Sequence, residues 1–267
     1  CFKTRYYYPQ RLFLIILTKK SMRLPWYLYF LTYFVKCRIF NRRIPLLAGF
    51  KITNRCNLRC MHCPFWKRTS PEMLTFGQVK QILLTLHGMG VRILILEGGE
   101  PSLWKDGTHT IHDVVEFAQT LFFSVGMTTN GTVPLTVPTN TVWVSVDGLR
   151  ETHNRIRDNS FDRVMEHIQS SNHPNIYANI TINQENYREI PDLVKFLTGK
   201  VKGITIQFHY PYENDDTLTL PFTERRQVLE TLITLKREGY PITDSYLCLE
   251  SLKDNSWHCH DWMLANV

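Results

Sequence analysis

The chain has 267 residues, enough for one large domain or two small ones, and its 43% hydrophobic and 21% charged residues exclude a disordered protein. Seven cysteines, three of them within eight residues, exclude a disulfide-stapled scaffold and indicate a reducing, intracellular compartment. The formal net charge of +7 is unevenly distributed, because fifteen Lys and Arg but no Asp or Glu precede Glu72. A basic arm on an acidic remainder predicts one local anionic partner, either a membrane surface or a nucleic acid.

Residues 1–47 are predicted to form this basic, aromatic-rich arm. The chain opens on Cys1, so we expect a fragment or a misassigned reading frame, with Met22 as the true start. The apolar run 12–17 has charged flanks like the first two regions of a signal peptide, but no small-residue cleavage site follows it.

Residues 24–35 are mainly apolar or aromatic, but they are too few for a bilayer span, which takes about 20 residues. Trp and Tyr favour the lipid headgroup level, and the basic residues that follow favour anionic lipid. The stretch 24–43 therefore predicts an interfacial helix, and with it a cytoplasmic protein that contacts the inner face of the membrane peripherally. The alternative is a helix that packs on the barrel. The basic residues are Lys36, Arg38, Arg42 and Arg43.

From residue 50 onward, short apolar segments alternate with amphipathic helical patterns, which is typical of a parallel sheet or barrel. Thr75 and Gln78 have the spacing of a helix capping box, and Gly88 and Gly90 end that helix. We predict an α/β fold, a partial (β/α)6 TIM-type barrel over residues 48–210, with a C-terminal extension over 211–267. The expected strands are 50–53, 92–96, 124–128, 141–146, 176–182 and 204–209, and the expected barrel helices begin near 76, 110, 161 and 186.

Cys56, Cys60 and Cys63 directly follow the first expected strand, with spacings of C-x3-C and C-x2-C. Three thiolates at this spacing can hold one iron–sulfur cube, and because such clusters normally have four cysteine ligands, one iron keeps an open position. A structural zinc site is the alternative. It needs a fourth ligand, which His62 would have to supply from between Met61 and Cys63.

A second motif, Gly98-Gly99-Glu100-Pro101, follows the second expected strand. C-x3-C-x2-C after one strand and Gly-Gly-Glu-Pro after the next resemble the radical S-adenosylmethionine (SAM) enzymes, over about residues 48–210. Active sites of barrels lie at the carboxyl ends of the strands, and both motifs fall at such ends.

The resemblance implies that Cys56, Cys60 and Cys63 hold three irons of a [4Fe-4S] cluster, while the amine and carboxylate of SAM chelate the fourth. One electron from the cluster then breaks a carbon–sulfur bond of SAM and gives a 5′-deoxyadenosyl radical. The electron is expected from an external donor of the flavodoxin or ferredoxin type. Glu100 suits a hydrogen bond to the SAM ammonium, and Gly98 and Gly99 permit close backbone approach.

The same resemblance gives further residues near SAM. His62 stands where the family often has an aromatic residue beside the adenine, although a solvent-facing histidine is the alternative. Ser145, at the end of the fourth expected strand, is similar to a residue that contacts the ribose or carboxylate. Arg157 has the spacing of a carboxylate-binding arginine, for which a guanidinium fork is suited; Arg155 is its rival, and a plain surface charge is the alternative for both. Thr129 and Asn130, at the rim of the barrel, are also expected near SAM, although short polar residues after a strand often only form turns.

The C-terminal extension contains Cys248 and Cys259. In relatives that modify peptides, cysteines beyond the barrel hold auxiliary iron–sulfur clusters, but two thiols cannot complete one. We therefore interpret these residues as buried free thiols or as ligands whose partners lie outside a truncated sequence.

Three functions compete. The arm favours a lipid or another membrane-associated hydrophobic substrate, and the lead-in Pro45-Leu46-Leu47 is loosely similar to the adenosylhopane synthase group. The second hypothesis is an enzyme that modifies peptides or proteins and has an auxiliary cluster. The third is a non-catalytic metal module that binds nucleic acid through the arm, and the SAM-type motifs count against it.

Overall fold

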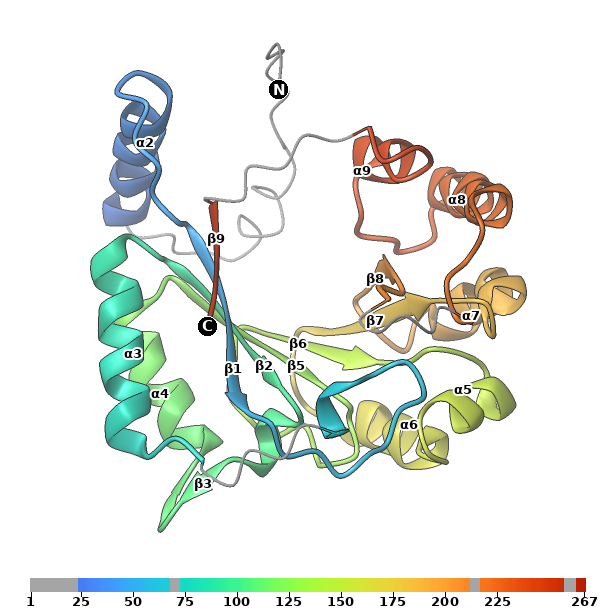
Figure 1. The fold of residues 1–267 in the computed structure, drawn as a ribbon, viewed down its shortest axis with the longest axis horizontal. Coiled ribbons are helices and arrows are strands. Elements are labelled where there is room, and N and C mark those ends of the chain that lie inside the picture. The colour runs from blue at the N-terminus through green and yellow to red at the C-terminus, as the bar shows by residue number, and fades with distance from the viewer. Residues whose placement is uncertain (1–23, 68–72, 212–216, 257–262) are drawn as a thin grey trace. The chain divides into compact units, whose positions relative to one another are not determined.

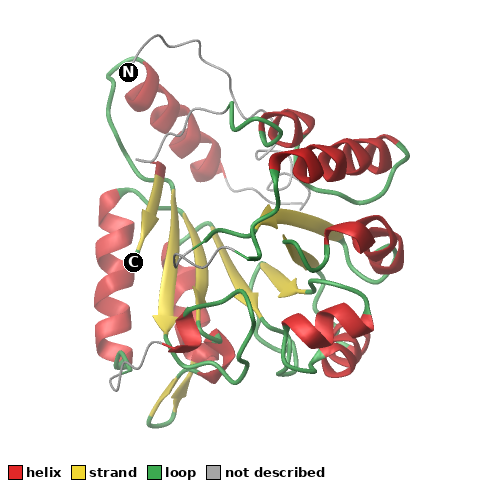
Figure 2. Ribbon diagram, turned by 45° about the vertical axis from the view of Figure 1, so that its right-hand side comes forward, coloured by secondary structure: helices red, strands yellow, loops and turns green. Residues whose placement is uncertain are grey.

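Seven parallel strands form one sheet in the spatial order β8-β7-β6-β5-β2-β1-β9. The computed structural model describes residues 24–67, 73–211, 217–256 and 263–267. Within residues 45–267 the sheet curves into a half-barrel with helices along its outer face (Figure 1, Figure 2). The predicted α/β half-barrel is therefore confirmed. The strands are β1 (Leu47–Thr53), β2 (Ile93–Gly98), β5 (Ser124–Thr129), β6 (Thr141–Ser145), β7 (Ile176–Ile182), β8 (Gly203–Phe208) and β9 (Leu264–Asn266).

Helices follow most strands, as the alternating pattern predicts. A short hairpin of β3 (Lys105–Asp106) and β4 (His109–Thr110) directly precedes helix α4 (Ile111–Leu121). The helices of this part of the chain are α3 (Phe76–Met89), α4 (Ile111–Leu121), α5 (Arg150–Ile156), α6 (Phe161–Ser170), α7 (Ile190–Leu197), α8 (Phe222–Arg237) and α9 (Tyr246–Ser251).

Local sequence signals set the ends of α3. The Thr75 hydroxyl accepts the backbone N–H of Gln78, and the Gln78 side chain accepts the N–H of Thr75, which completes the expected capping box. The helix ends at Gly90, whose φ of 110° lies in the left-handed region that glycine adopts without strain. Between β5 and β6 the chain forms no helix, in agreement with Pro134 and Pro138 there.

The apolar residues form two clusters. One packs β1, β2 and β5 against α3 and α4, and the other packs β6, β7 and β8 against α6, α7 and α8. Strands buried in this way tolerate near-continuous apolar runs, and Leu94, Leu96, Val142 and Val144 are fully buried. The carboxyl ends of these buried strands present the motifs.

The strand β9 was not expected. It pairs with β1 in register from Leu47 opposite Leu264, and the N–H of Val267 donates to the carbonyl of Gly49 at 3.0 Å. Three residues are too short to show a strand pattern, and the partner lies more than 200 residues earlier in the chain. The segment interpreted as an extension thus contributes an edge strand to the sheet.

The chain divides into two compact units, Cys1–Ile44 and Pro45–Val267. The described part of the first contains α2 (Leu24–Arg38), where an interfacial helix is expected. In α2, Tyr27, Leu28, Leu31 and Phe34 are between 42% and 61% exposed. Within the described residues, every helix is too short or too polar to cross a membrane.

Candidate active site

The predicted site residues gather at the carboxyl ends of neighbouring strands. The cysteine segment follows β1, the Gly-Gly-Glu-Pro segment follows β2, Thr129 and Asn130 end or follow β5, and Ser145 ends β6. Because β6, β5, β2 and β1 are consecutive neighbours in the sheet, these ends lie along one edge. We call residues 54–64 the cysteine loop.

The cysteine loop is held by its own backbone and by a neighbouring helix. The N–H of Met61 donates to the carbonyl of Ile156 at 2.9 Å, and the N–H of Cys63 donates to the carbonyl of Cys60 at 3.2 Å. Cys60 is buried, whereas Cys56 and Cys63 are partly exposed, and all three are free thiols. Burial raises the pKa of the Cys60 thiol to about 11 and also raises that of Cys56.

The two glycines bring the end of β2 against this loop. A Cβ on Gly98, whose φ is 137°, would collide with the carbonyl oxygen of Thr53, and a Cβ on Gly99 would collide with that of Arg55. The N–H of Gly99 donates to Thr53 and that of Glu100 donates to Arg55, each at 2.7 Å. The two glycines therefore allow the segment after β2 to pack closely against the end of β1 and the cysteine loop.

Glu100 is completely buried at this junction. Its Oε1 accepts the Ser102 hydroxyl at 2.6 Å, the Ser102 N–H at 3.1 Å and the Thr129 hydroxyl at 2.7 Å, and its Oε2 accepts the Asn130 N–H at 2.7 Å. All four donors are neutral. In the described part of the chain, no cationic side chain forms an ion pair with this carboxylate.

Asn130 connects Glu100 to the cysteine loop. Its Nδ2 lies 2.9 Å from the side-chain oxygen of Asn57 and 3.8 Å from the Cys56 sulfur. Asn57 in turn donates to the Thr132 hydroxyl at 2.7 Å. Thr129 and Asn130 therefore adjoin Glu100 and Cys56, as their place on the strand rim predicts.

On the β6 side, Arg157 adjoins the cysteine loop. Its Nε donates to Asp147 Oδ2 at 2.5 Å, its Nη1 lies 3.8 Å from the Cys60 sulfur, and its Nη2 lies 3.5 Å from His62 Nε2. Arg157 and Asp147 are both buried. The rival Arg155 is exposed and pairs with Glu185 at 2.9 Å, away from this group.

Sequence reasoning missed Asp147 as a member of the site. Burial alone would raise its pKa, but the charge of Arg157 and the N–H of Thr181, which donates at 2.7 Å, hold the pKa below its ordinary value. The amide of Asn186 donates to the Asp147 carbonyl at 2.7 Å. The signal that could have found it is position, since Asp147 stands two residues after the end of β6 and ten before Arg157.

His153 was also missed. It is buried; its Nδ1 accepts the backbone N–H of Asp147 at 3.3 Å, and its Nε2 lies 3.0 Å from the Ser160 hydroxyl. Burial and the nearby Arg157 lower its pKa to about 4. The neutral imidazole of His153 therefore holds the Asp147 backbone in place through this hydrogen bond.

His62 is turned into the protein rather than toward solvent. Its Nε2 lies 3.8 Å from Asp147 Oδ2, its ring is edge-on to His209 at 6.4 Å, and its Nδ1 is buried with no partner. Burial, followed by the charge of Arg157, lowers its pKa to about 4. Across the described residues, no three His, Cys, Asp or Glu side chains converge to hold a single metal ion.

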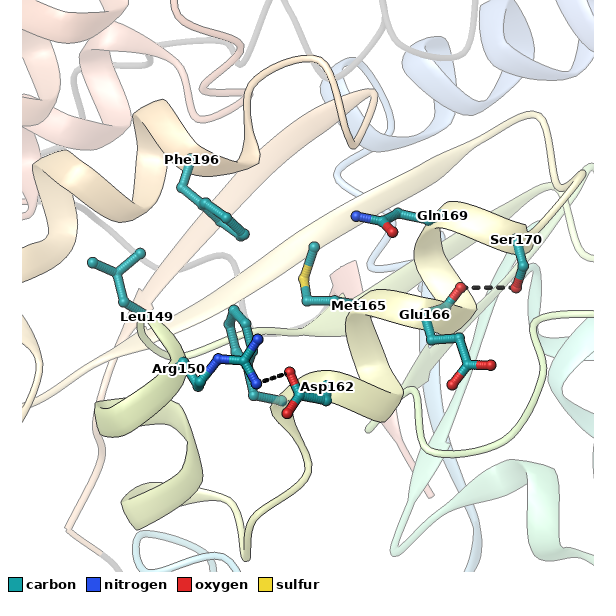
Figure 3. Close-up of a pocket in the computed structure, with 9 residues that line it drawn as sticks. Leu149, Arg150, Asp162, Met165, Glu166, Gln169, Ser170 and Phe196 are labelled. Atoms are coloured by element: carbon teal, nitrogen blue, oxygen red, sulfur yellow. Dashed lines mark hydrogen bonds and ion pairs between the residues drawn. The ribbon is translucent and has the colours of Figure 1, made fainter.

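Cys248 is exposed on α9 rather than buried as expected, and Cys259 lies outside the described residues. A hollow of about 740 Å³ lies over α5, α6 and α7 (Figure 3). It contains none of the predicted site residues, and its floor is apolar with an Arg150–Asp162 ion pair at one side.

Comparison with curated proteins identifies relatives of moderate similarity. Fe-coproporphyrin III synthase of Methanosarcina barkeri is 26% identical, over 77% of this chain and 58% of its own length. GTP 3′,8-cyclase of Rhizobium etli is 28% identical, over 75% of this chain and 63% of its own length. The chain thus spans less than two thirds of these relatives.

Solved structures share the fold. SuiB of Streptococcus suis bound to S-adenosylmethionine superposes with a TM-score of 0.65 at 15% identity, over 85% of this chain and 57% of SuiB. The enzyme anSMEcpe with bound AdoMet and a peptide gives 0.60 at 18% identity, over 73% of this chain and 60% of that one.

The sequence itself matches the Radical SAM superfamily over residues 50–197, which is more than half of the chain and includes the cysteine loop, Glu100 and Arg157. The chain therefore belongs to the radical SAM superfamily of enzymes, which use a [4Fe-4S] cluster and S-adenosylmethionine.

Proposed function

We propose that this chain binds a [4Fe-4S] cluster through Cys56, Cys60 and Cys63 and cleaves SAM reductively. The observation that carries the proposal is Glu100, a buried carboxylate beside the cysteine loop that is held by neutral donors alone. Buried charges in proteins are normally paired. The ammonium group of SAM would supply the missing cation.

The cysteine loop fits the cluster chemically. Three free thiols stand on one loop, and iron binds thiolates, so the cluster would displace the protons that burial holds on Cys56 and Cys60. Asn130 and Arg157 each place an N–H group 3.8 Å from one of these two sulfurs. When bound, the cluster supplies one electron that splits SAM into methionine and a 5′-deoxyadenosyl radical.

The chain's own residues would orient SAM by its charged ends. Glu100 would accept a hydrogen bond from the SAM ammonium, while Thr129 and Asn130 hold the carboxylate oxygens of Glu100 in place. The Nη1 and Nη2 groups of Arg157 would bind the carboxylate of SAM. Asp147 accepts the Nε–H of Arg157 and so orients these two groups toward the cysteine loop. Gly98 and Gly99 would keep the β2 segment close to that loop.

Two further residues complete the proposed SAM site. The free Nδ1 of His62 would face the adenine side, since it is a buried polar atom without a partner. Ser145 is buried at the end of β6, next in the sheet to β5, and would contact the ribose or carboxylate.

The test of this function is the Cys60→Ala variant. Thiolates hold such clusters, so the variant should lose nearly all cluster iron and all SAM cleavage after anaerobic reconstitution. Iron content, the visible absorption of the cluster and formation of 5′-deoxyadenosine are the measurements. Cys248→Ala is the matched control, and it should retain both. Near-full iron loading and SAM cleavage in Cys60→Ala would overturn the assignment.

For the substrate, we propose a lipid or another hydrophobic molecule met at the cytoplasmic face of a membrane. The names of the relatives describe different products and leave the substrate class open. The support is α2, because its exposed aromatic and aliphatic residues adjoin Lys36, Arg38, Arg42 and Arg43. A peptide substrate with an auxiliary cluster remains the second candidate, and Cys248 is its one cysteine among the described residues of the extension.

Vesicle co-sedimentation tests the membrane contact. Anionic vesicles should bind the protein more tightly than neutral ones, by about 1 kcal/mol per basic residue near the surface. Salt should weaken this part, because the screening length falls to about 3 Å at 1 M. Arg42→Gln with Arg43→Gln should remove part of it and keep the apolar remainder. A protein that stays in the supernatant with anionic vesicles at low salt would refute the lipid proposal.

A further inference from the structure

Two hollows adjoin each other on the helical face of the half-barrel. The larger, about 740 Å³, lies over α5, α6 and α7 (Figure 3), and the smaller, about 430 Å³, lies where α6 and the α7–β8 connection meet the start of β7. Gln169 lines both hollows. The smaller one lies at the amino ends of β7 and β8, whereas the cysteine loop lies at the carboxyl edge of the sheet, so this surface is separate from the proposed SAM site.

The larger hollow has an apolar floor. Phe161 and Met165 of α6 are buried there, and the ring centre of Phe196 on α7 lies 5.9 Å from that of Phe161. The ion pair at one side leaves no net charge at that point, and Glu166 points away from the floor (Figure 3). Ligand pockets in proteins typically measure about 300–1,000 Å³ and are mostly apolar, so this hollow has the size and the lining for a hydrocarbon chain.

The smaller hollow is basic. Lys200 and Lys202 line it, and the described residues around it include no Asp or Glu. The ammonium of Lys200 donates to the carbonyl of Phe196 at 2.7 Å, and that of Lys202 donates to the side-chain oxygen of Asn175 at 2.5 Å. Both acceptors are neutral. Because an ammonium group has three N–H donors, each lysine keeps the capacity to donate to an anion.

Phe196 and Lys200 join the two hollows. The Lys200 ammonium lies 4.2 Å from the centre of the Phe196 ring. Since this ring lines the larger hollow and the ammonium lines the smaller, a positive charge stands at the boundary of the apolar floor. A molecule that lies across both hollows would therefore place apolar atoms on Phe196 and a negative charge at Lys200.

We propose that the two hollows bind one long-chain fatty acid, with its hydrocarbon chain on the apolar floor and its carboxylate at Lys200 and Lys202. Charge complementarity selects the anionic head group, because the smaller hollow presents two ammonium groups. One apolar hollow beside one basic hollow selects a single chain with a single head group, and the volumes are those of small-molecule sites. The site goes beyond the SAM chemistry proposed above and does not depend on it.

Equilibrium dialysis of labelled oleate, below its micelle concentration, tests the head-group contact. The wild type should bind oleate saturably, and Lys200→Gln with Lys202→Gln should bind it about tenfold more weakly or worse, because both charge-assisted hydrogen bonds are lost. Lys105→Gln with Lys195→Gln makes the same change of charge at exposed residues outside both hollows. This control should bind oleate as the wild type does.

A second variant tests the chain contact. Gln169 is exposed where the hollows meet, so Gln169→Trp adds a large ring there without entering the core and should abolish oleate binding, whereas Gln169→Ala should retain it. Oleyl alcohol has the same chain without the charge and should bind at least about tenfold more weakly than oleate. Butyrate has the charge with little chain to bury and should not compete with oleate.

The variants also separate this site from other places where a lipid could bind. Oleate held at α2 or beside the cysteine loop would be unaffected by the changes at Lys200, Lys202 and Gln169. Equal oleate affinity in the wild type and the lysine variant would therefore overturn the proposal, as would equal affinity for oleate and oleyl alcohol. Thermal unfolding followed by circular dichroism checks each variant, and if Gln169→Trp does not fold, the lysine variant and oleyl alcohol decide.

Two further outcomes would overturn the proposal. One is uptake of oleate only above its micelle concentration, which would show adsorption of the detergent-like micelle rather than a site. The other is binding of an acidic amphipathic peptide that the lysine variant loses, without binding of oleate. That result would assign the surface to a protein partner.

Discussion

Two buried carboxylates adjoin the cysteine loop, and they are stabilised in different ways. Glu100 accepts four hydrogen bonds from neutral groups, whereas Asp147 pairs with the buried guanidinium of Arg157 and accepts the N–H of Thr181. Asp147 thus already has its counter-charge within the chain. Glu100 has neutral donors only, which is why we propose that the SAM ammonium binds on this side of the loop and that the SAM carboxylate meets the Nη groups of Arg157 on the other side.

The largest effect is expected from Asp147→Asn. Removing one partner of a buried ion pair leaves the other charge uncompensated, which typically costs about 3–5 kcal/mol of folding stability. Denaturant unfolding followed by circular dichroism under anaerobic conditions measures it. The exposed pair Arg150–Asp162 is the matched control, since both side chains are more than 60% exposed, and Asp162→Asn should cost about 0–1 kcal/mol. Equal losses in the two variants would show that the buried pair has no special structural role.

A smaller effect, on binding rather than folding, is expected from Glu100→Gln. The amide keeps the shape of the side chain but loses the charge, so SAM affinity should fall by about 1.5–3 kcal/mol, the range for charged hydrogen bonds. Cluster iron should be unchanged. Titration of SAM by calorimetry measures the affinity.

Glu97→Gln is the control for this change, because Glu97 precedes Glu100 by three residues but pairs with Lys51 at the surface. Its SAM affinity should equal that of the wild type. If Glu100→Gln also bound SAM normally, Glu100 would be a structural turn residue and the contrast between the two carboxylates would lose its functional meaning.

The smallest effect concerns pH and the support of Asp147 by His153. The folded pKa of His153 is about 4, below its ordinary 6.5, so the unfolded chain binds the proton more readily between these values. The folding stability that the neutral His153 contributes is fully present above about pH 6.5. It decreases as the pH is lowered below that value, by at most about 1.4 kcal/mol per pH unit. His153→Gln does not titrate. Unfolding free energies at pH 7 and 5.5 should show the wild type losing about 1 kcal/mol more than the variant, and equal losses would contradict the buried neutral histidine.

Sequence patterns predicted most of the half-barrel because its elements follow local rules. Alternating apolar segments located six strands, and the α3 capping box and glycine stop were readable from residues a few positions apart. The cysteine spacing and Gly-Gly-Glu-Pro were equally local, and these motifs pointed to the family. The edge strand β9 and the short helix α5 were missed, since both are too short for a periodic signal.

The sequence by itself thus determined which chemistry the chain carries: three thiols on one loop, a carboxylate after β2 and a basic stretch with no acidic residue before Glu72. Tertiary structure alone decided how these groups are used. It placed Arg157, which its spacing already favoured over Arg155, against the cysteine loop, paired it with Asp147, and left Glu100 among neutral donors. The physical reason is that ion pairing and burial depend on which residues from distant strands meet at one edge of the sheet, and the spacing of residues along a chain does not encode that meeting.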